Sequence, residues 1–276
     1  MDKPGVLIIG GGILQSYAIA KARKKGFDIY LTDGDKNCYC ASLSDQFFQI
    51  NTKNFQDTSE LAIKLKKTGQ IKSVYTQGTD VAFTVAYAAK KAGLIGLDPD
   101  IAWSTENKVI MRQKLSSSGI DNTKFMVVNK KEELEDCERI VGYPCYIKPA
   151  DNSGSRGITR VTNAANLASA FDNAIKNCLL ETKVLIEEEI LGNEFSIDTI
   201  VIDKKLYNAG ISDRVFNKKV KYAVQSGSIT PSLLAENKQK EMVDIMEKIT
   251  TAFEINNSAL KGDLIIDENG EIRVIE

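Results

Sequence analysis

A lysine at the end of an apolar strand pattern, followed by a loop rich in glycine and serine, is the clearest chemical signal in this sequence. The segment YPCYIKPADNSGSRGI spans residues 143–158 and contains Lys148. On a strand, Lys148 shares one face with Tyr146 and Ala150, and an ammonium group among apolar neighbours needs a polar partner. Glycine lets the backbone amides of the loop approach an anion. A bound polyphosphate would satisfy the lysine and the loop together; the alternative is an exposed hairpin tip with a solvated lysine.

Two further charged segments are consistent with such a site. Lys108 lies in the first turn of a helix predicted around residues 106–115, where a cation opposes the helix dipole and an anionic ligand would account for its presence. Three consecutive glutamates, residues 187–189, end one predicted strand, and Glu194 begins the next. Either these glutamates form a solvated face, or the segment is a hinge whose backbone contacts adenine while Glu194 binds ribose hydroxyls.

The last segment, LKGDLIIDENGEIRVIE, is predicted to form a β-hairpin. Asn269-Gly270 is a preferred two-residue turn. With those two residues as the loop, Glu268 pairs with Glu271, and Asp263 lies opposite Glu276. Two facing carboxylates repel each other, and a magnesium ion between them would convert the repulsion into a binding site. A register shifted by one residue would instead place the two carboxylates on opposite faces.

A glycine-rich turn near the N-terminus offers a different function. Residues 10–15, GGGILQ, nearly match the dinucleotide-binding pattern G-x-G-x-x-G, but Gln15 replaces the third glycine. Asp33 follows the second strand, as a ribose-binding residue would. An NAD(P)-dependent oxidoreductase is one interpretation. The other is a tight strand-to-helix turn that simply needs glycine and that could accept a small anion at the helix N-terminus.

Composition narrows the chemistry further. The 276 residues include no histidine and five cysteines without a CxxC pair, and the net charge is −1. Histidine-dependent catalytic triads and histidine-containing zinc sites are therefore excluded, which leaves carboxylates, lysines, arginines, backbone amides and oxygen-seeking metals. The charge favours neither a nucleic-acid nor a membrane partner, and no apolar run approaches the ~18 residues of a membrane span. The cysteine pattern favours a reducing, cytoplasmic location.

The elements that carry these residues change character along the chain. Residues 1–98 alternate between strands and helices, which predicts a Rossmann-like parallel sheet with right-handed crossovers. After Asp98-Pro99 the order becomes α+β, with strand pairs that we expect to be antiparallel. A long helix, about residues 238–253, precedes the final hairpin.

Taken together and in this order, the segments resemble the ATP-grasp superfamily, with a pre-ATP-grasp domain at the N-terminus. The resemblance implies three parts: a Rossmann-like pre-ATP-grasp domain at 1–98, a small lobe with a flexible phosphate loop at 99–186, and a large lobe with a metal-binding hairpin at 187–276. The family usually continues its last motif as Glu-x-Asn, whereas this sequence stops at Glu276. We therefore expect a truncated ATP-grasp fold with an incomplete metal site.

The resemblance also implies ligands and residues for a nucleotide site. Lys108 and Lys148 would hold the phosphates of ATP, and the loop around Ser155 would close over them. Asp263 and Glu276 would bind Mg²⁺, with Mn²⁺ as an alternative ion.

The adenosine part of the nucleotide would lie at the glutamate-rich segment. Glu187 and the backbone of Glu188 and Ile190 would meet adenine, and Glu194 would bind the ribose.

The implied reaction is that of a carboxylate–amine ligase of the carbamoyl-phosphate-synthase-like branch, which forms a C–N bond and ADP through an acyl phosphate. Lys261 stands where several members carry a cation near the transferred phosphate, and Arg214 would hold a substrate carboxylate. The substrates would be a small-molecule acid and amine, and homodimers are common in the family. The alternatives are the NAD(P)-dependent oxidoreductase above and a non-catalytic ATP-binding module.

Overall fold

The computed structural model describes residues 3–216 and 225–276. The chain divides into two compact units, Met1–Glu106 and Asn107–Glu276. None of the helices in the described ranges is both long and apolar enough to cross a membrane. Each unit is built around its own sheets and its own apolar core, and the predicted combination of a parallel sheet followed by antiparallel sheets is confirmed.

The first unit is a parallel four-stranded sheet in the order β3-β2-β1-β4. Its strands are β1 (Gly5–Ile9), β2 (Asp28–Asp33), β3 (Gln46–Gln49) and β4 (Ile71–Thr76). Its helices are α1 (Gln15–Lys24), α2 (Phe55–Lys67), α3 (Ala82–Lys91) and α4 (Pro99–Glu106), with a 3-10 turn, η1, at Ala41–Leu43. Sequence patterns did not predict β3, because this short strand is only partly buried and its alternation is weak.

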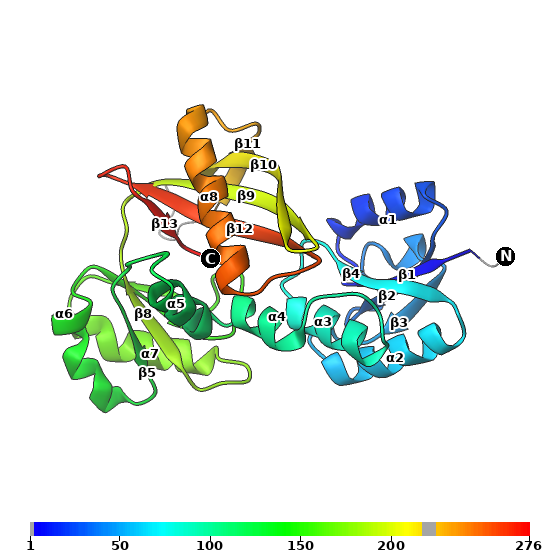
Figure 1. Cartoon of the computed structure of the whole chain (residues 1–276). Helices are drawn as coiled ribbons and strands as arrows, with labels where there is room; N and C mark the ends of the chain where they lie inside the picture. The colour runs from blue at the N-terminus through cyan, green and yellow to red at the C-terminus, as the bar shows by residue number, and fades with distance from the viewer. Residues whose placement is uncertain (1–2, 217–224) are drawn as a thin grey trace. The chain divides into compact units, whose positions relative to one another are not determined.

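Alternate residues of β1 supply the two faces of this sheet. Val6 and Ile8 pack with Ile19 of α1 on one face, whereas Leu7 and Ile9 pack against the face covered by α2 and α3. Figure 1 shows α1 on one side of the sheet and α2 with α3 on the other. The continuous apolar run of β1 is thus explained by burial on both faces.

Helix α4 belongs to the first unit. The rings of Trp103 in α4 and Phe83 in α3 meet edge to face with centroids 5.6 Å apart. The division between the units therefore falls after Glu106, later than the predicted boundary at residue 98.

The second unit contains an antiparallel four-stranded sheet in the order β5-β8-β6-β7. Its strands are β5 (Phe125–Val128), β6 (Cys145–Pro149), β7 (Thr159–Val161) and β8 (Val184–Glu188). Around it lie α5 (Lys108–Ser117), α6 (Cys137–Ile140), α7 (Leu167–Lys176) and the 3-10 turns η2 (Lys131–Asp136) and η3 (Ala164–Asn166). Cys145 and Ile147 of β6 lie in the core beneath α7, whereas Tyr146 and Lys148 point to the opposite, half-buried face.

The other sheet of this unit has the order β11-β10-β9-β12-β13. Its strands are β9 (Gly192–Ile202), β10 (Lys205–Phe216), β11 (Gln225–Ile229), β12 (Ser258–Asp267) and β13 (Ile272–Val274), and helix α8 spans Glu236–Ala252. A Cβ at Gly262 of β12 would lie 2.7 Å from the sulfur of Met246, so glycine lets α8 approach the sheet closely. The change of sheet falls between Glu188 and Gly192, whereas the predicted boundary at 186/187 would cut through β8.

The predicted turn of the last hairpin is wrong, but the predicted pairing of its two carboxylate residues holds. Ile266 pairs with Ile272, and the N–H of Asp267 donates to the carbonyl of Glu271 at 2.9 Å, which leaves residues 268–270 as a three-residue loop in which Gly270 has a φ of +80°. A β-bulge then shifts the register back by one residue. The N–H groups of Ile275 and Glu276 both donate to the carbonyl oxygen of Asp263, at 2.8 and 3.2 Å, and the Asp263 N–H donates to the Glu276 carbonyl oxygen at 2.7 Å.

The glycine turn after β1 has conformational requirements that differ along its length. Gly10 has a φ of +94°, and a Cβ there would lie 2.8 Å from the Thr79 hydroxyl oxygen. A Cβ at Gly11 would overlap the sulfur of Cys38. Gly12 has no positive φ, and its nearest neighbour would be the flexible Gln15 amide at 3.2 Å. The fold therefore needs the first two glycines more than the third.

Replacing these glycines by alanine tests that difference. We expect Gly10→Ala to lower the free energy of unfolding by at least about 1–2 kcal/mol, because alanine disfavours a positive φ. Gly12→Ala should stay within about 0.5 kcal/mol of the wild type. Urea unfolding followed by circular dichroism measures both, and equal losses in the two variants would contradict this account.

Candidate functional site

The N-terminus of helix α5 lies beside the end of β6, where the glycine- and serine-rich loop starts. The Asn107 side-chain oxygen caps the helix by accepting the N–H groups of Val109 and Ile110, both at 3.1 Å. The N–H of Lys108 donates to the carbonyl of Ala150, just after β6, at 2.7 Å. The first residue of α5 is therefore tied to the end of the strand that carries Lys148.

The side chain of Lys108 joins the loop to the last hairpin. Lys108 is 6% exposed. Its ammonium group donates to the Asn152 carbonyl at 3.0 Å and to a carboxylate oxygen of Glu276 at 2.6 Å. A predicted phosphate lysine, the base of the predicted flexible loop and a predicted metal ligand thus meet at one ammonium group.

Lys148 meets a different carboxylate, that of Glu187. Lys148 pairs with Leu185 across β6 and β8, so Glu187 is its diagonal neighbour on the same face. The ammonium group lies 2.5 Å from one oxygen of Glu187, and the Arg112 Nε donates to the other. Burial opposes ionisation of Glu187, which is 3% exposed, but Lys148 and Arg112 outweigh it and keep the pKa of this carboxyl below its ordinary value.

Sequence patterns did not identify Arg112, the most deeply buried charge of the site. Arg112 is 1% exposed. Besides Glu187, its guanidinium contacts Asp121 at 3.0 Å and the carbonyl of Val274 at 2.7 Å. The sequence contained one indication of its role: Arg112 follows Lys108 by four positions and therefore lies on the same face of α5. That face is turned toward the end of the last hairpin, where Arg112 contacts Val274 of β13 and Lys108 contacts Glu276 just after it.

A second charged cluster lies on the large sheet. The order β10-β9-β12 places Arg214, Glu194 and Asp263 on three neighbouring strands. One nitrogen of the Arg214 guanidinium lies 2.8 Å from Glu194 and 3.1 Å from Asp263. Asp263 also accepts the Ser196 hydroxyl at 2.8 Å and contacts the ammonium of the half-exposed Lys261.

Glu194 and Glu276 relate the cluster on the large sheet to the two lysines. Burial raises the pKa of this carboxyl, Arg214 lowers it, Asp263 raises it and Lys148 lowers it, and the net direction is upward. Lys148 therefore lies within electrostatic reach of Glu194, while Glu276 is held by Lys108 and paired through its backbone with Asp263. Glu276 therefore joins Lys108 to the cluster of Asp263, Arg214 and Glu194 within the second unit.

The other residues that we predicted to contact the nucleotide lie in the loop around Ser155 and at the end of β8. Ser155 lies in the exposed loop with a φ of +59°. The N–H of Glu188 donates to the Lys124 carbonyl at 3.0 Å, so this amide is already engaged. Ile190 is half-buried just after β8. Both oxygens of Glu187 contact cations, so its carboxylate holds Lys148 in place, and its predicted contact with adenine stays a prediction.

The metal-ligand prediction rests on two carboxylates. Within residues 3–216 and 225–276 there is no cluster of three or more side chains suited to hold a metal. Asp263 and Glu276 nevertheless fit Mg²⁺ chemically, because that ion commonly takes one or two carboxylates and completes its shell with water and substrate phosphates.

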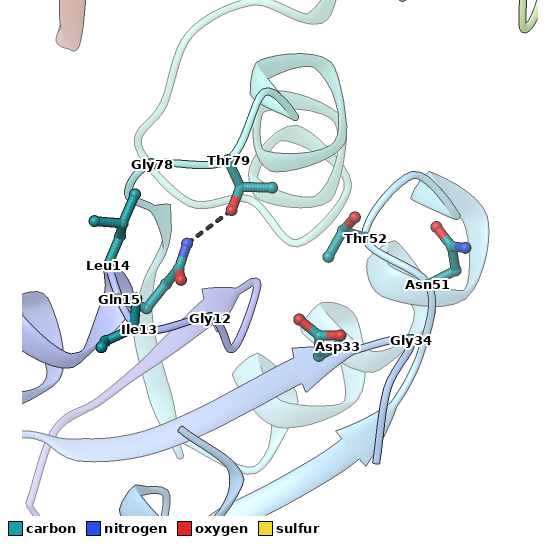
Figure 2. Close-up of a pocket in the computed structure, with 10 residues that line it drawn as sticks. All are labelled: Gly12, Ile13, Leu14, Gln15, Asp33, Gly34, Asn51, Thr52, Gly78 and Thr79. Atoms are coloured by element: carbon teal, nitrogen blue, oxygen red, sulfur yellow. Dashed lines mark hydrogen bonds between the residues drawn. The ribbon is translucent and has the colours of Figure 1, made fainter. Parts of the chain in front are cut away.

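The first unit has a pocket of about 480 Å³ at the carboxyl edge of its parallel sheet. Figure 2 shows the pocket with the residues that line it. They are Gly12, Ile13, Leu14, Gln15, Asp33, Gly34, Asn51, Thr52, Gly78 and Thr79. These come from the turns that follow β1, β2, β3 and β4, the edge at which open α/β sheets bind ligands.

Two observations oppose a dinucleotide in this pocket. The amide of Gln15, which replaces the third glycine, donates to the Thr79 hydroxyl at 2.7 Å and to the Gln77 carbonyl. The carboxylate of Asp33 accepts the N–H groups of Gly11 at 2.7 Å and Asp35 at 2.9 Å. The predicted ribose-binding carboxylate is thus occupied in shaping the turn.

Comparison with known proteins relates the second unit to the ATP-grasp domain. Residues 141–276 match the family model described as the ATP-grasp domain. A D-alanine–D-alanine ligase of Bacillus pumilus is 28% identical over 182 residues, covering 62% of this chain and 49% of the relative. The carbamoyl phosphate synthase large chain of Bifidobacterium adolescentis is 24% identical over 265 residues, covering 87% of this chain and 23% of the relative. The chain thus spans about half the length of the first relative and about a quarter of the second.

Solved structures share the whole fold. The biotin carboxylase domain dimer of the Hydrogenobacter thermophilus 2-oxoglutarate carboxylase, in complex with MgADP, ADP and bicarbonate, superposes with a TM-score of 0.81 at 16% identity. The match covers 100% of this chain and 64% of that chain. Nothing in the comparisons supports an oxidoreductase.

The buried carboxylate of Glu187 gives a pH-dependent prediction. Glu187→Gln should lower the free energy of unfolding at pH 7 by about 3–5 kcal/mol, because Lys148 loses its counter-charge and Arg112 keeps only that of Asp121. The pKa of Glu187 is lower in the folded state, so its stabilisation is present above the unfolded value of about 4.3 and is lost as pH falls below it. The difference between wild type and variant should therefore shrink on acidification, as measured by urea midpoints between pH 7 and pH 3.

Glu241→Gln is the matched control. Glu241 forms an exposed pair with Lys238 at 2.5 Å, and exposed pairs contribute about 0–1 kcal/mol. A loss in Glu187→Gln no larger than in this control, or a difference that is independent of pH, would contradict the buried network.

Proposed function

Since the chain belongs to the ATP-grasp superfamily, we propose that it is the nucleotide-binding part of an ATP-dependent ligase that joins a carboxylate to an amine. The observation that carries the proposal is the contact of Lys108 with both Asn152 and Glu276. A phosphate-binding cation, a glycine-rich loop and a metal-binding carboxylate at one point are what a triphosphate and its counter-ion require.

In the proposed reaction, a carboxylate oxygen attacks the γ-phosphorus of ATP, and ADP leaves. The amine nitrogen then attacks the acyl carbon, phosphate leaves, and the nitrogen loses a proton. The protein has little covalent work in such a transfer, because alignment and charge neutralisation supply most of the catalysis. A chain without histidine can therefore perform it.

Lys108 and Lys148 neutralise the phosphates in this proposal. Each now has a carboxylate partner, Glu276 or Glu187. Phosphate oxygens would replace Glu276 at Lys108 and add to Glu187 at Lys148. The loop around Ser155 would cover the phosphates and exclude water from the acyl phosphate.

The other charged residues take the remaining roles. Glu194 would bind the ribose, and the backbone around Glu188 and Ile190 would meet the adenine. Arg214 would release Glu194 and Asp263 and hold the substrate carboxylate. Lys261, half-exposed beside Asp263, would approach the transferred phosphate.

Asp263 and Glu276 would hold Mg²⁺, or Mn²⁺ as an alternative ion. When bound, the ion neutralises charge on the phosphate oxygens and orients them for transfer. Ser196 keeps the Asp263 carboxylate oriented through its hydroxyl.

The pocket of the first unit would receive one of the small-molecule substrates. Its lining combines polar groups with the apolar side chains of Ile13 and Leu14, and its one carboxylate, Asp33, is already hydrogen-bonded, so a small molecule with both apolar and uncharged polar groups suits it better than a cation. We further propose a cytoplasmic protein, which the five free cysteines support. A homodimer is a further part of the proposal, by similarity to the carboxylase domain dimer.

Replacing Lys148 tests the nucleotide site. Lys148→Met should weaken MgATP binding about 10- to 100-fold, since a buried charge-assisted contact to phosphate is lost. Isothermal titration calorimetry measures the affinity, and circular dichroism checks that the fold persists. Lys131→Met is the control, because Lys131 forms an exposed pair with Asp172. Wild-type affinity in Lys148→Met would refute this nucleotide site.

Release of ADP separates a ligase from a binding module. We expect a coupled assay over paired small acids and amines to show ADP formation that requires both substrates and a divalent ion. MgATP binding without ADP release for any pair, in the full-length natural protein, would favour the non-catalytic alternative.

A further inference from the structure

The base of the predicted phosphate loop is tied to a second loop. We call residues 151–157 the flap, and residues 177–183, between α7 and β8, the brace. The Asp151 carboxylate is buried, with 7% of the residue exposed. It accepts the N–H of Leu179 at 2.8 Å, of Leu180 at 2.5 Å and of Glu181 at 2.9 Å. Within the described part of the chain it has no ion-pair partner.

Further contacts join the same two loops at both ends of the flap. The Asn152 side chain donates to the Asn177 carbonyl at 2.7 Å. At the other end, Gly157 has a φ of +76°, and a Cβ there would lie 2.6 Å from the Cβ of Asn177. The flap therefore leaves and rejoins the sheet against one segment, and only its central residues are unattached to it.

The choice of aspartate at position 151 follows from the brace. Three successive N–H groups that converge on one point form a small anion-binding concavity, and hydrogen bonds to a charged acceptor are stronger than those to a neutral one. A carboxylate fills this concavity from within the chain. The next residue, Asn152, offers its carbonyl to Lys108, so the flap base lies between the brace and a proposed phosphate ligand.

We propose that Asp151 is a positioning residue that fixes the flap base on the brace, so that only the central residues, Ser153–Arg156, move when nucleotide binds. This anchor, the contact of Asp151 with the brace amides, keeps the Asn152 carbonyl beside Lys108. It thereby fixes the position of the Lys108 ammonium group before phosphate binds. Without the anchor, the whole flap shifts with its base and closes poorly over the acyl phosphate. The role of the closed flap rests on the proposed function; the anchoring itself does not.

Cleavage by trypsin after Arg156, an exposed residue of the flap, reports on the anchor directly. Without nucleotide, Asp151→Asn should be cut there about tenfold faster than wild type, because local opening becomes easier. Mass spectrometry identifies the cut. Asp172→Asn is the matched control, since it removes an exposed carboxylate of α7 that contacts only Lys131. Asn152→Ala loses one link and should give a smaller increase.

Nucleotide separates positioning from simple destabilisation. A non-hydrolysable MgATP analogue should protect Arg156 in wild type and in Asp172→Asn, but much less in Asp151→Asn at saturating ligand. The same variant should release more ADP without amine, relative to its coupled rate, than wild type does. A variant that was merely less stable would show the wild-type degree of protection by the analogue and the wild-type ratio of uncoupled to coupled ADP release.

The outcomes distinguish this inference from the proposed function. If wild type does not bind the analogue, the proposed function fails, and the nucleotide-free cleavage rates still test the anchor. If Asp151→Asn and Asn152→Ala are cut and protected like wild type, the anchor is overturned. If Asp151→Asn does not fold, Asn152→Ala decides by the same two measurements.

Discussion

The structure of the second unit depends on one buried carboxylate between two buried cations. Glu187 neutralises Arg112 and Lys148 at a position that solvent hardly reaches. Removing Glu187 or Lys148 would leave a buried charge without its partner. Because Arg112 also contacts Asp121 and Val274, the same carboxylate holds together α5, β8 and β13. The small sheet and the last hairpin are thereby held in register around the site.

Internal charge pairing also balances the charges of the proposed triphosphate site within the protein. Lys108 rests on Glu276, and Arg214 and Lys261 rest on Asp263. Each cation has a carboxylate that phosphate can replace, and each carboxylate has a cation that a metal ion can replace. Ligand binding then exchanges partners within a neutral cluster, which costs less than exposing single charges to a dry interior.

The hairpin illustrates how a local rule and the final structure diverge. The preference for Asn-Gly in a two-residue turn predicted the pairing of Asp263 with Glu276, yet the turn has three loop residues. The bulge at Ile275 restores the pairing. Turn propensity acts on four residues, whereas the register of β12 is set along its whole length by β9, so the tertiary contacts prevail and the bulge absorbs the difference.

Periodicity and residue type alone were sufficient to identify the parallel sheet and the α+β order and to single out the two lysines as candidates, because hydrophobic patterns and charges among apolar neighbours are local properties. The roles of Arg112 and Asp151 became visible only in three dimensions. Arg112 looks like any helix-face arginine until β8 and β13 bury it, and Asp151 looks like a turn residue until three amides from the brace converge on it. Burial and convergence of distant backbone groups are properties of the packed chain, and no short stretch of sequence encodes them.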